Sequence, residues 1–116
     1  MVTSGELTQI LNLLAYLAMG HCVADYPLQT DRIAVEKCPG CDTTLHWRWW
    51  LGAHAGVHGF FVVLITGIPM LGLGEWVLHM LIDYGKCKKR YNLAVDQSLH
   101  IGCKLLWAVL AVSLLQ

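Results

Sequence analysis

Four pairs of histidine or aspartate residues share one spacing in this chain. The partners of each pair are four residues apart, and the pairs are His21/Asp25, His54/His58, His79/Asp83 and Asp96/His100. On an α-helix this spacing places both side chains on one face, about 40° and about 6 Å apart. One helix can then offer two ligands to a single metal ion. Because the pairs hold five of the six histidines and three of the five aspartates, they predict a metal site built between helices.

The eight paired residues are more ligands than one zinc ion uses. Zinc takes four ligands, so five imidazoles and three carboxylates suit two ions, about 3.5–4 Å apart and bridged by a carboxylate. Mixed nitrogen and oxygen donors favour zinc, manganese or iron over magnesium or calcium. We therefore expect one or two divalent transition-metal ions, with zinc as the first choice. Asp25, Asp83 and Asp96 are candidates for a general base, and Lys86 could steady a developing negative charge.

A weaker second signal lies in a predicted loop. Cys38 and Cys41 form a Cys-Pro-Gly-Cys turn, and His46 follows at a spacing seen in zinc knuckles. The position where a fourth ligand would fall is Leu51, so the site is incomplete within this segment. A zinc site completed from elsewhere, a pair of free thiols in a reducing compartment, and redox chemistry all stay open.

The composition is that of a membrane protein. Hydrophobic residues make up 56% of the 116 residues and charged residues only 14%, against about 25% charged residues in soluble domains. The mean hydropathy is +0.52. Net charge is zero, so bulk electrostatics give no argument for a nucleic-acid partner. A small globule of this composition lacks the polar surface that water requires, and the expected partner is a lipid bilayer.

Three long uncharged or nearly uncharged runs are each long enough to span a bilayer, which needs about 20 apolar residues. We predict an all-α fold in which residues 1–116 form one membrane-embedded domain, a four-helix transmembrane bundle. The predicted helices are 7–25, 49–69, 73–86 and 95–115, with a loop at 26–48. The third helix is the shortest and must be tilted or partly re-entrant.

The basic residues predict an orientation for this bundle. Arg32, Lys37 and Arg48 follow the first helix, and a basic run from Lys86 to Arg90 follows the third. Cytoplasmic loops carry an excess of lysine and arginine, so both basic loops are expected in the cytoplasm and both termini outside. All four pairs then lie near the cytoplasmic ends of their helices, where they can meet at one depth.

The order of the motifs resembles a known family. Residues 21–29 read H-x3-D-Y-P-L-Q, residues 54–58 H-x3-H, residues 79–86 H-x3-D-x2-K and residues 96–100 D-Q-x2-H. This order resembles a family of small bacterial and phage membrane proteins catalogued only as a domain of unknown function. The resemblance implies a four-helix membrane protein and brings no activity with it. More loosely, the pattern looks like that of membrane-bound metal-dependent hydrolases.

These observations lead to one expected function and several alternatives. We expect a membrane metalloprotein of a bacterial inner membrane or a phage-infected host membrane, acting as a hydrolase on an anionic lipid or phosphoester substrate. The same residues could instead conduct protons or ions, transport a metal, or hydrogen-bond across helices in a non-catalytic interaction protein. Four short helices would make a narrow pathway, so transport would require an oligomer. A soluble metalloenzyme is a further alternative.

Overall fold

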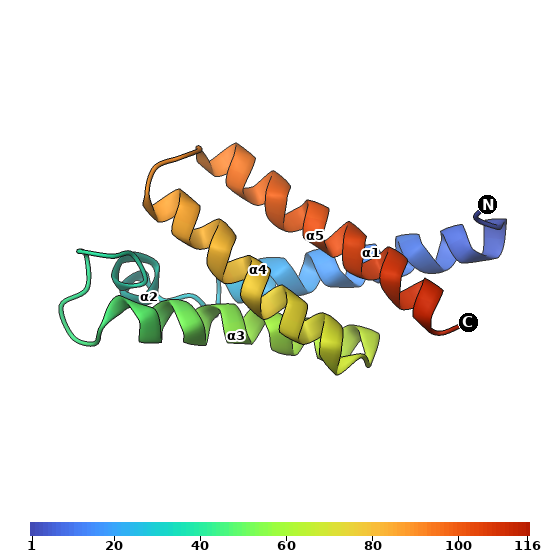
Figure 1. Ribbon diagram of the computed structural model, residues 1–116, viewed down its shortest axis with the longest axis horizontal. Helices are drawn as coiled ribbons and strands as arrows, with labels where there is room; N and C mark the ends of the chain where they lie inside the picture. The colour runs from blue at the N-terminus through green and yellow to red at the C-terminus, as the bar shows by residue number, and fades with distance from the viewer.

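The computed structural model describes all 116 residues and consists of α-helices joined by short loops (Figure 1). The all-α prediction is confirmed. The prediction of four helices omitted a six-residue helix, α2, inside the expected loop 26–48. The helices are α1 (Ser4–Asp25), α2 (Asp31–Glu36), α3 (Trp47–Thr66), α4 (Pro69–Cys87) and α5 (Leu93–Leu114).

Local capping signals fix where the helices begin and end. The Thr3 side chain accepts a hydrogen bond from the Glu6 N–H while Glu6 accepts one from the Thr3 N–H, a capping box that starts α1 earlier than expected. Asn92 caps α5 in a similar way by accepting from the Val95 N–H. Gly67 ends α3 with a φ of +73°, a left-handed conformation that glycine adopts without strain. The chain then turns directly into α4.

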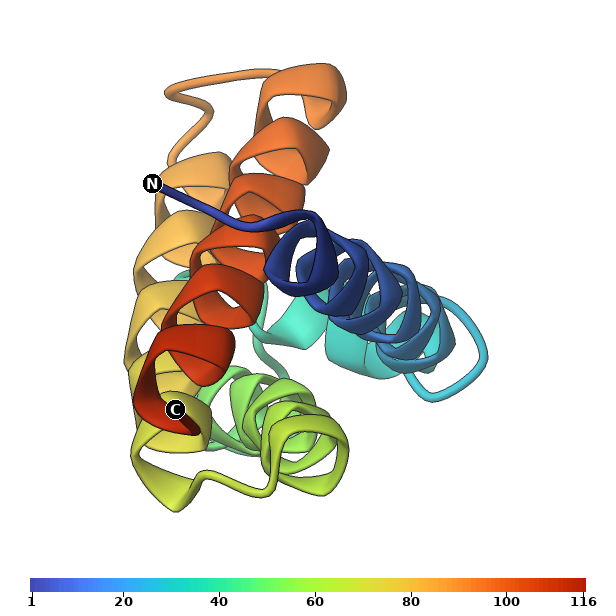
Figure 2. The ribbon, with the colours of Figure 1, turned by 90° about the vertical axis from the view of Figure 1, so that its right-hand side faces the viewer.

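The four long helices form a bundle in which α1 and α4 each contact both α3 and α5 (Figure 2). The molecule measures 50 × 25 × 21 Å. Both termini and the α3–α4 turn lie at one end, whereas α2 and the α4–α5 loop lie at the other (Figure 1). The basic residues predicted to share one side therefore do gather at one end of the bundle.

Helices α3 and α4 approach most closely where two glycines face each other. A Cβ atom at Gly59 would lie 2.7 Å from the Gly72 carbonyl oxygen. A Cβ at Gly72 would lie 2.8 Å from the Gly59 carbonyl oxygen and 2.1 Å from Val63 Cγ2. Small residues at such crossings let two backbones meet, as they commonly do in membrane bundles.

The burial pattern is inverted relative to a soluble protein. Among the 26 buried residues, polar and charged ones are as numerous as hydrophobic ones. Large apolar side chains such as Leu11, Phe60 and Leu64 are instead exposed. Helices α1, α3 and α5 are long and apolar enough to cross a membrane, whereas α4 does not meet that description.

The hydrophobic core occupies only part of the bundle. It lies toward the termini and is called here the apolar half; its members are Ile10, Leu17, Val62, Leu71, Trp107, Ala108, Ala111 and Val112. The interior at the opposite end is filled by ionisable side chains.

Candidate metal centre

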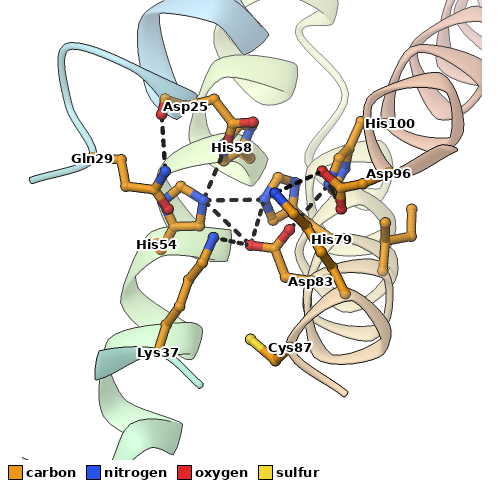
Figure 3. Close-up of polar contacts among 12 residues, drawn as sticks. Asp25, Gln29, Lys37, His54, His58, His79, Asp83, Cys87, Asp96 and His100 are labelled. Atoms are coloured by element: carbon orange, nitrogen blue, oxygen red, sulfur yellow. Dashed lines mark hydrogen bonds and ion pairs between the residues drawn. The ribbon is translucent and has the colours of Figure 1, made fainter. Parts of the chain in front are cut away.

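All four histidine and aspartate pairs meet inside the bundle at the end where α2 lies, and Figure 3 labels every member except His21. Pairs on α1 and α4 lie near the C-terminal ends of those helices, and the pair on α5 lies near its beginning. Seven of the eight residues are at most 4% exposed, and the Asp25 side chain is 10% exposed. The predicted convergence of the pairs at one depth is therefore present. The eight residues are called here the ligand cluster.

One part of the ligand cluster joins three helices around Asp25. Its Oδ1 lies 2.9 Å from His58 Nε2 and 3.2 Å from His54 Nε2. His79 Nε2 lies 3.3 Å from His54 Nε2. Together these four residues form a set whose ligand atoms all lie within 4.8 Å of one another. Three imidazoles and a carboxylate are a ligand set typical of zinc.

Asp83 connects this set to a second one. Its Oδ2 lies 3.4 Å from His79 Nε2 and 3.5 Å from His54 Nε2. Its Oδ1 lies 3.1 Å from His100 Nε2, which is also 3.4 Å from Asp96 Oδ1. Each oxygen of one carboxylate therefore faces a different group of potential ligands. Asp83, Asp96 and His100 form a second set that could hold a metal ion.

These distances fit the dimensions of a metal-coordination sphere. Bonds of about 2.1 Å at tetrahedral angles place neighbouring ligand atoms about 3.4 Å apart. The distances around His54 Nε2, from 3.2 to 3.5 Å, lie close to that value. Asp96 Oδ1 is buried, accepts no hydrogen bond and lies 3.4 Å from His100 Nε2, so this oxygen is available to bind a cation or to accept a proton.

The balance of charges around the ligand cluster also favours a bound cation. The carboxylates in and beside it carry four negative charges. Two lysines pair closely with them, at 2.7 and 2.5 Å, whereas the exposed Lys86 is 3.9 Å from its partner. Negative charge therefore remains in excess when the histidines are neutral, which favours the binding of cations. The four carboxylates are Asp25, Glu75, Asp83 and Asp96, and the two lysines are Lys37 and Lys104.

Glu75 supports the cluster from the side of the apolar half. One of its oxygens lies 3.3 Å from His79 Nδ1 and accepts from Lys104 Nζ at 2.5 Å, and the other accepts from Trp107 Nε1 at 2.6 Å. A carboxylate on the far nitrogen of a histidine fixes the tautomer that leaves Nε2 free to bind metal. Sequence reasoning missed Glu75, although it precedes His79 by four residues and so repeats the spacing of the pairs.

His21 has a different environment from the other histidines. Its Nε2 lies 2.9 Å from Gln97 Oε1, so the geometry fits a donated N–H rather than a metal ligand. The Gln97 amide group in turn donates to Asp25 Oδ2 at 3.1 Å and Asp96 Oδ2 at 3.0 Å. His21 lies outside the sets that could hold a metal. His21 thus orients Gln97 in this structure, and its role as a metal ligand stays a prediction.

Two lysines approach the cluster from outside. Lys86, predicted to face it, has its Nζ 3.9 Å from Asp96 Oδ2 and is 42% exposed in its side chain. Lys37, which follows α2 and was not predicted, places its Nζ 2.7 Å from Asp83 Oδ2. Figure 3 shows this contact between Lys37 and Asp83. No sequence pattern connects the two residues, because their contact depends on how the α2 segment packs against the long helices.

The weak cysteine site does not form as predicted. Cys38 is joined in a disulfide to Cys87, at the end of α4, and Cys41 remains a free, exposed thiol. The third expected member, His46, caps α3 instead, because its Nδ1 accepts from the Arg48 N–H. The disulfide ties the α2 segment to α4 directly beside the ligand cluster.

Glu36 holds the loop that follows α2. Its Oε1 accepts from the N–H groups of Thr43 and Thr44 at 2.6 and 2.7 Å, and both threonine hydroxyls also donate to it. The hydrogen bonds to the charged carboxylate, from the Thr43 N–H above all, lower the pKa of Glu36 below its ordinary value. The loop between Lys37 and Thr44 is thereby folded against the end of α2.

Comparison with known proteins gives a family without an assigned function. The family described as "Protein of unknown function (DUF3307)" matches residues 13–115, and the chain belongs to it. The resemblance to an uncharacterised family is thus confirmed. No curated protein and no solved structure matches the chain.

Proposed function

We propose that this member of the DUF3307 family is an integral membrane metalloprotein that holds two divalent transition-metal ions, bridged by Asp83, and hydrolyses a phosphoester in or at the membrane. The observation that carries the proposal is the position of the Asp83 carboxylate. One of its oxygens faces His54 and His79, and the other faces His100. A carboxylate shared in this way is the usual bridge of two-metal hydrolytic sites.

The proposed membrane arrangement follows from the exposed surface and the charges. Helices α1, α3 and α5 cross the bilayer, and α4 packs against α3 and α5 with its ionisable residues inward. The basic end is placed in the cytoplasm because it carries seven of the eight lysines and arginines. In that reducing compartment Cys38 and Cys87 would be neighbouring thiols. Labelling of Cys41 from the outside of sealed cells would contradict this placement.

Different residues of the site would have different roles in hydrolysis. Bound metal ions would polarise a phosphoryl oxygen and supply a hydroxide nucleophile at neutral pH. We assign Asp96 as the general base, because its Oδ1 has no hydrogen-bond donor. Lys86 lies on the outer side of Asp96 and can neutralise charge on the leaving oxygen. Asp25 stays a ligand, since both of its oxygens are engaged.

An ion pathway is the main alternative use of the same residues. The stacked rings of His58, His79 and His100, with centroids 3.7 and 4.2 Å apart, resemble a proton relay. The apolar half argues against transport across a single copy, because buried Leu17 and Val62 close the interior beyond the ligand cluster. Hydrolysis at one face is therefore the function we favour.

The proposal is tested by elemental analysis of detergent-purified protein. We expect zinc, manganese or iron at about two ions per chain in the wild type and their loss in the double variant His54→Ala/His58→Ala. The control is His46→Ala, which changes a histidine outside the cluster and should keep the metal. Metal-dependent release of phosphate from a phosphomonoester should be lost in Asp96→Asn with the fold retained. Absence of metal from the wild type would overturn the proposal.

A further inference from the structure

We propose that a cavity beside Asp83 binds the phosphate group of the substrate, and that Lys37 leaves Asp83 to hold this phosphate when the metal ions are bound. This inference rests on the proposed metal centre and names the substrate class as a phosphomonoester. It assigns a binding role to a residue that sequence patterns did not identify.

The cavity has about 320 Å³ of space and lies where α2 and the loop after it meet the end of α4. Its charged lining consists of three lysines, Lys37, Lys86 and Lys89, and a single carboxylate, Asp83. Asp83 is also the bridging residue of the ligand cluster, so the cavity opens directly onto the proposed metal centre. A group bound in it would lie within reach of the reacting atoms.

The contact between Lys37 and Asp83 cannot persist beside a bound metal ion. Lys37 Nζ is 2.7 Å from Asp83 Oδ2, the same oxygen that faces the Nε2 atoms of His54 and His79. An ion held by this oxygen would bring two positive charges close to the ammonium group, in an interior where repulsion is stronger than in water. The flexible lysine stem allows the ammonium group to move into the cavity.

Once Asp83 binds metal, the cavity lining holds three ammonium groups and no free carboxylate, and only Lys86 keeps a carboxylate partner outside the lining, Asp96 at 3.9 Å. Such a site suits an anion of more than one charge. A phosphomonoester carries between about −1.5 and −2 at neutral pH and offers three oxygen acceptors, whereas a carboxylate carries only one charge. Lysine binds phosphate as a compact point charge.

Size and position agree with a phosphate-bearing group. Ligand pockets usually span about 300–1,000 Å³, so this cavity fits a small headgroup rather than an acyl chain. It lies at the basic end of the bundle, beside loops that the proposed topology places at the level of lipid headgroups. The phosphate could belong to a lipid or to a soluble ester, and the experiment distinguishes the two.

Close packing and a hydrogen bond hold the lysines around the cavity. Cys38, the residue after Lys37, lies against Cys87, the residue after Lys86, with their Cα atoms 5.2 Å apart. The Lys89 N–H donates to the Lys86 carbonyl at 2.8 Å and closes the turn that follows α4. Three separate positions of the chain are thus fixed around one space.

The test is calorimetric binding of inorganic phosphate to zinc-loaded full-length protein in phosphatidylcholine nanodiscs. We expect Lys37→Met to weaken binding about tenfold or more, which is the loss typical of a charge-assisted hydrogen bond. Lys37→Arg should restore most of the affinity. The matched control is Lys88→Met, a lysine next to Lys89 at the end of α4 but outside the cavity lining, which should bind as the wild type does.

Metal content, measured on the same samples, separates this inference from the proposed function. If metal is bound and Lys37→Met leaves the affinity for phosphate unchanged, the inference is overturned and the proposed metal centre is not. Phosphate binding that depends on Lys37 in protein that takes up no metal would support the cavity as the binding site, but it would overturn both the metal centre and the dependence of Lys37 on bound metal. A wild type that binds neither metal nor phosphate would overturn both.

Competition between inorganic phosphate and two phosphomonoesters distinguishes a lipid substrate from a soluble one. Nanodiscs that contain phosphatidic acid should mask the site from inorganic phosphate if the substrate is a lipid. Glycerol 3-phosphate should compete, and phosphatidic acid should not, if the substrate is a soluble ester. Failure of both phosphomonoesters to compete with inorganic phosphate would contradict the assigned substrate class.

Discussion

The two ends of this bundle bury opposite kinds of side chain, apolar at one end and ionisable at the other. The apolar half packs Ile10, Leu17 and Val62 against Trp107 and the alanines of α5, with no ionisable group among its buried residues. The ligand cluster fills the other end with imidazoles and carboxylates that are equally buried. Both ends use the same four helices. The contrast shows that apolar packing at one end holds the helices together, whereas the other end positions ionisable side chains that could bind a ligand.

Physical cost explains why the two regions are separate. Buried polar atoms without partners, such as Nδ1 of His21, His58 and His100, each cost free energy. Close packing of apolar side chains in the apolar half offsets that cost. The comparison therefore predicts that changes in the apolar half alter stability, whereas changes in the ligand cluster alter metal binding.

The largest effect is expected from Leu17→Ala. Leu17 is 1% exposed in the apolar half, so its truncation leaves a cavity and should lower the free energy of unfolding by about 2–5 kcal/mol. Thermal unfolding in detergent measures the change. The matched control is Leu64→Ala, since Leu64 is 65% exposed and should change stability by less than about 0.5 kcal/mol. Metal content per folded chain should be unchanged in both, and its loss in Leu17→Ala would break the comparison.

A smaller effect is expected where α3 and α4 cross. Gly72→Ala places a methyl group against the Gly59 carbonyl and Val63, which should cost about 1–3 kcal/mol of stability. Gly102→Ala is the control, because a Cβ at Gly102 meets nothing within 4 Å and should stabilise the helix by up to about 1 kcal/mol. Equal unfolding temperatures for the two variants would show that this crossing is not tightly packed.

The smallest effect concerns the loop at the polar end and appears only with acid. Because the pKa of Glu36 is lowered in the folded protein, its bonds to Thr43 and Thr44 are fully present above its ordinary pKa of 4.5. They should be lost as the pH falls below that value toward the lowered pKa. Hydrogen exchange at the two threonine amides, corrected for intrinsic rates, measures this loss. Glu36→Gln should make the protection independent of pH in this range, and a persistent pH dependence would assign it to another group.

Much of the fold and part of the site could be predicted from local sequence. Hydropathy gave the three long apolar helices, and the four-residue spacing placed each pair on one helix face. The agreement between the basic loops and the position of the pairs indicated that the pairs meet at one end. These properties depend on residues close together in sequence, and periodicity reports them directly.

What sequence reasoning missed depends on tertiary contacts. The pairing of Lys37 with Asp83 spans 46 residues, and that of Cys38 with Cys87 spans 49. Both depend on the short helix α2, whose six residues are too few to leave a clear pattern. His21 carries the same sequence signal as the other ligand candidates. Only the position of Gln97, on another helix, shows that its Nε2 is already engaged.

The short turn between α3 and α4 has a consequence for how the chain enters a bilayer. Helix α4 carries the ionisable residues Glu75, His79 and Asp83. Without its neighbouring helices it would therefore insert poorly into a membrane. Because only Gly67 and Ile68 separate them, we expect α3 and α4 to insert together as a hairpin whose helices meet at Gly59 and Gly72. We expect glycosylation mapping to find α4 inserted when α3 precedes it and excluded when it is presented alone. Assembly of the protein would then begin with this hairpin, before α5 has been synthesised.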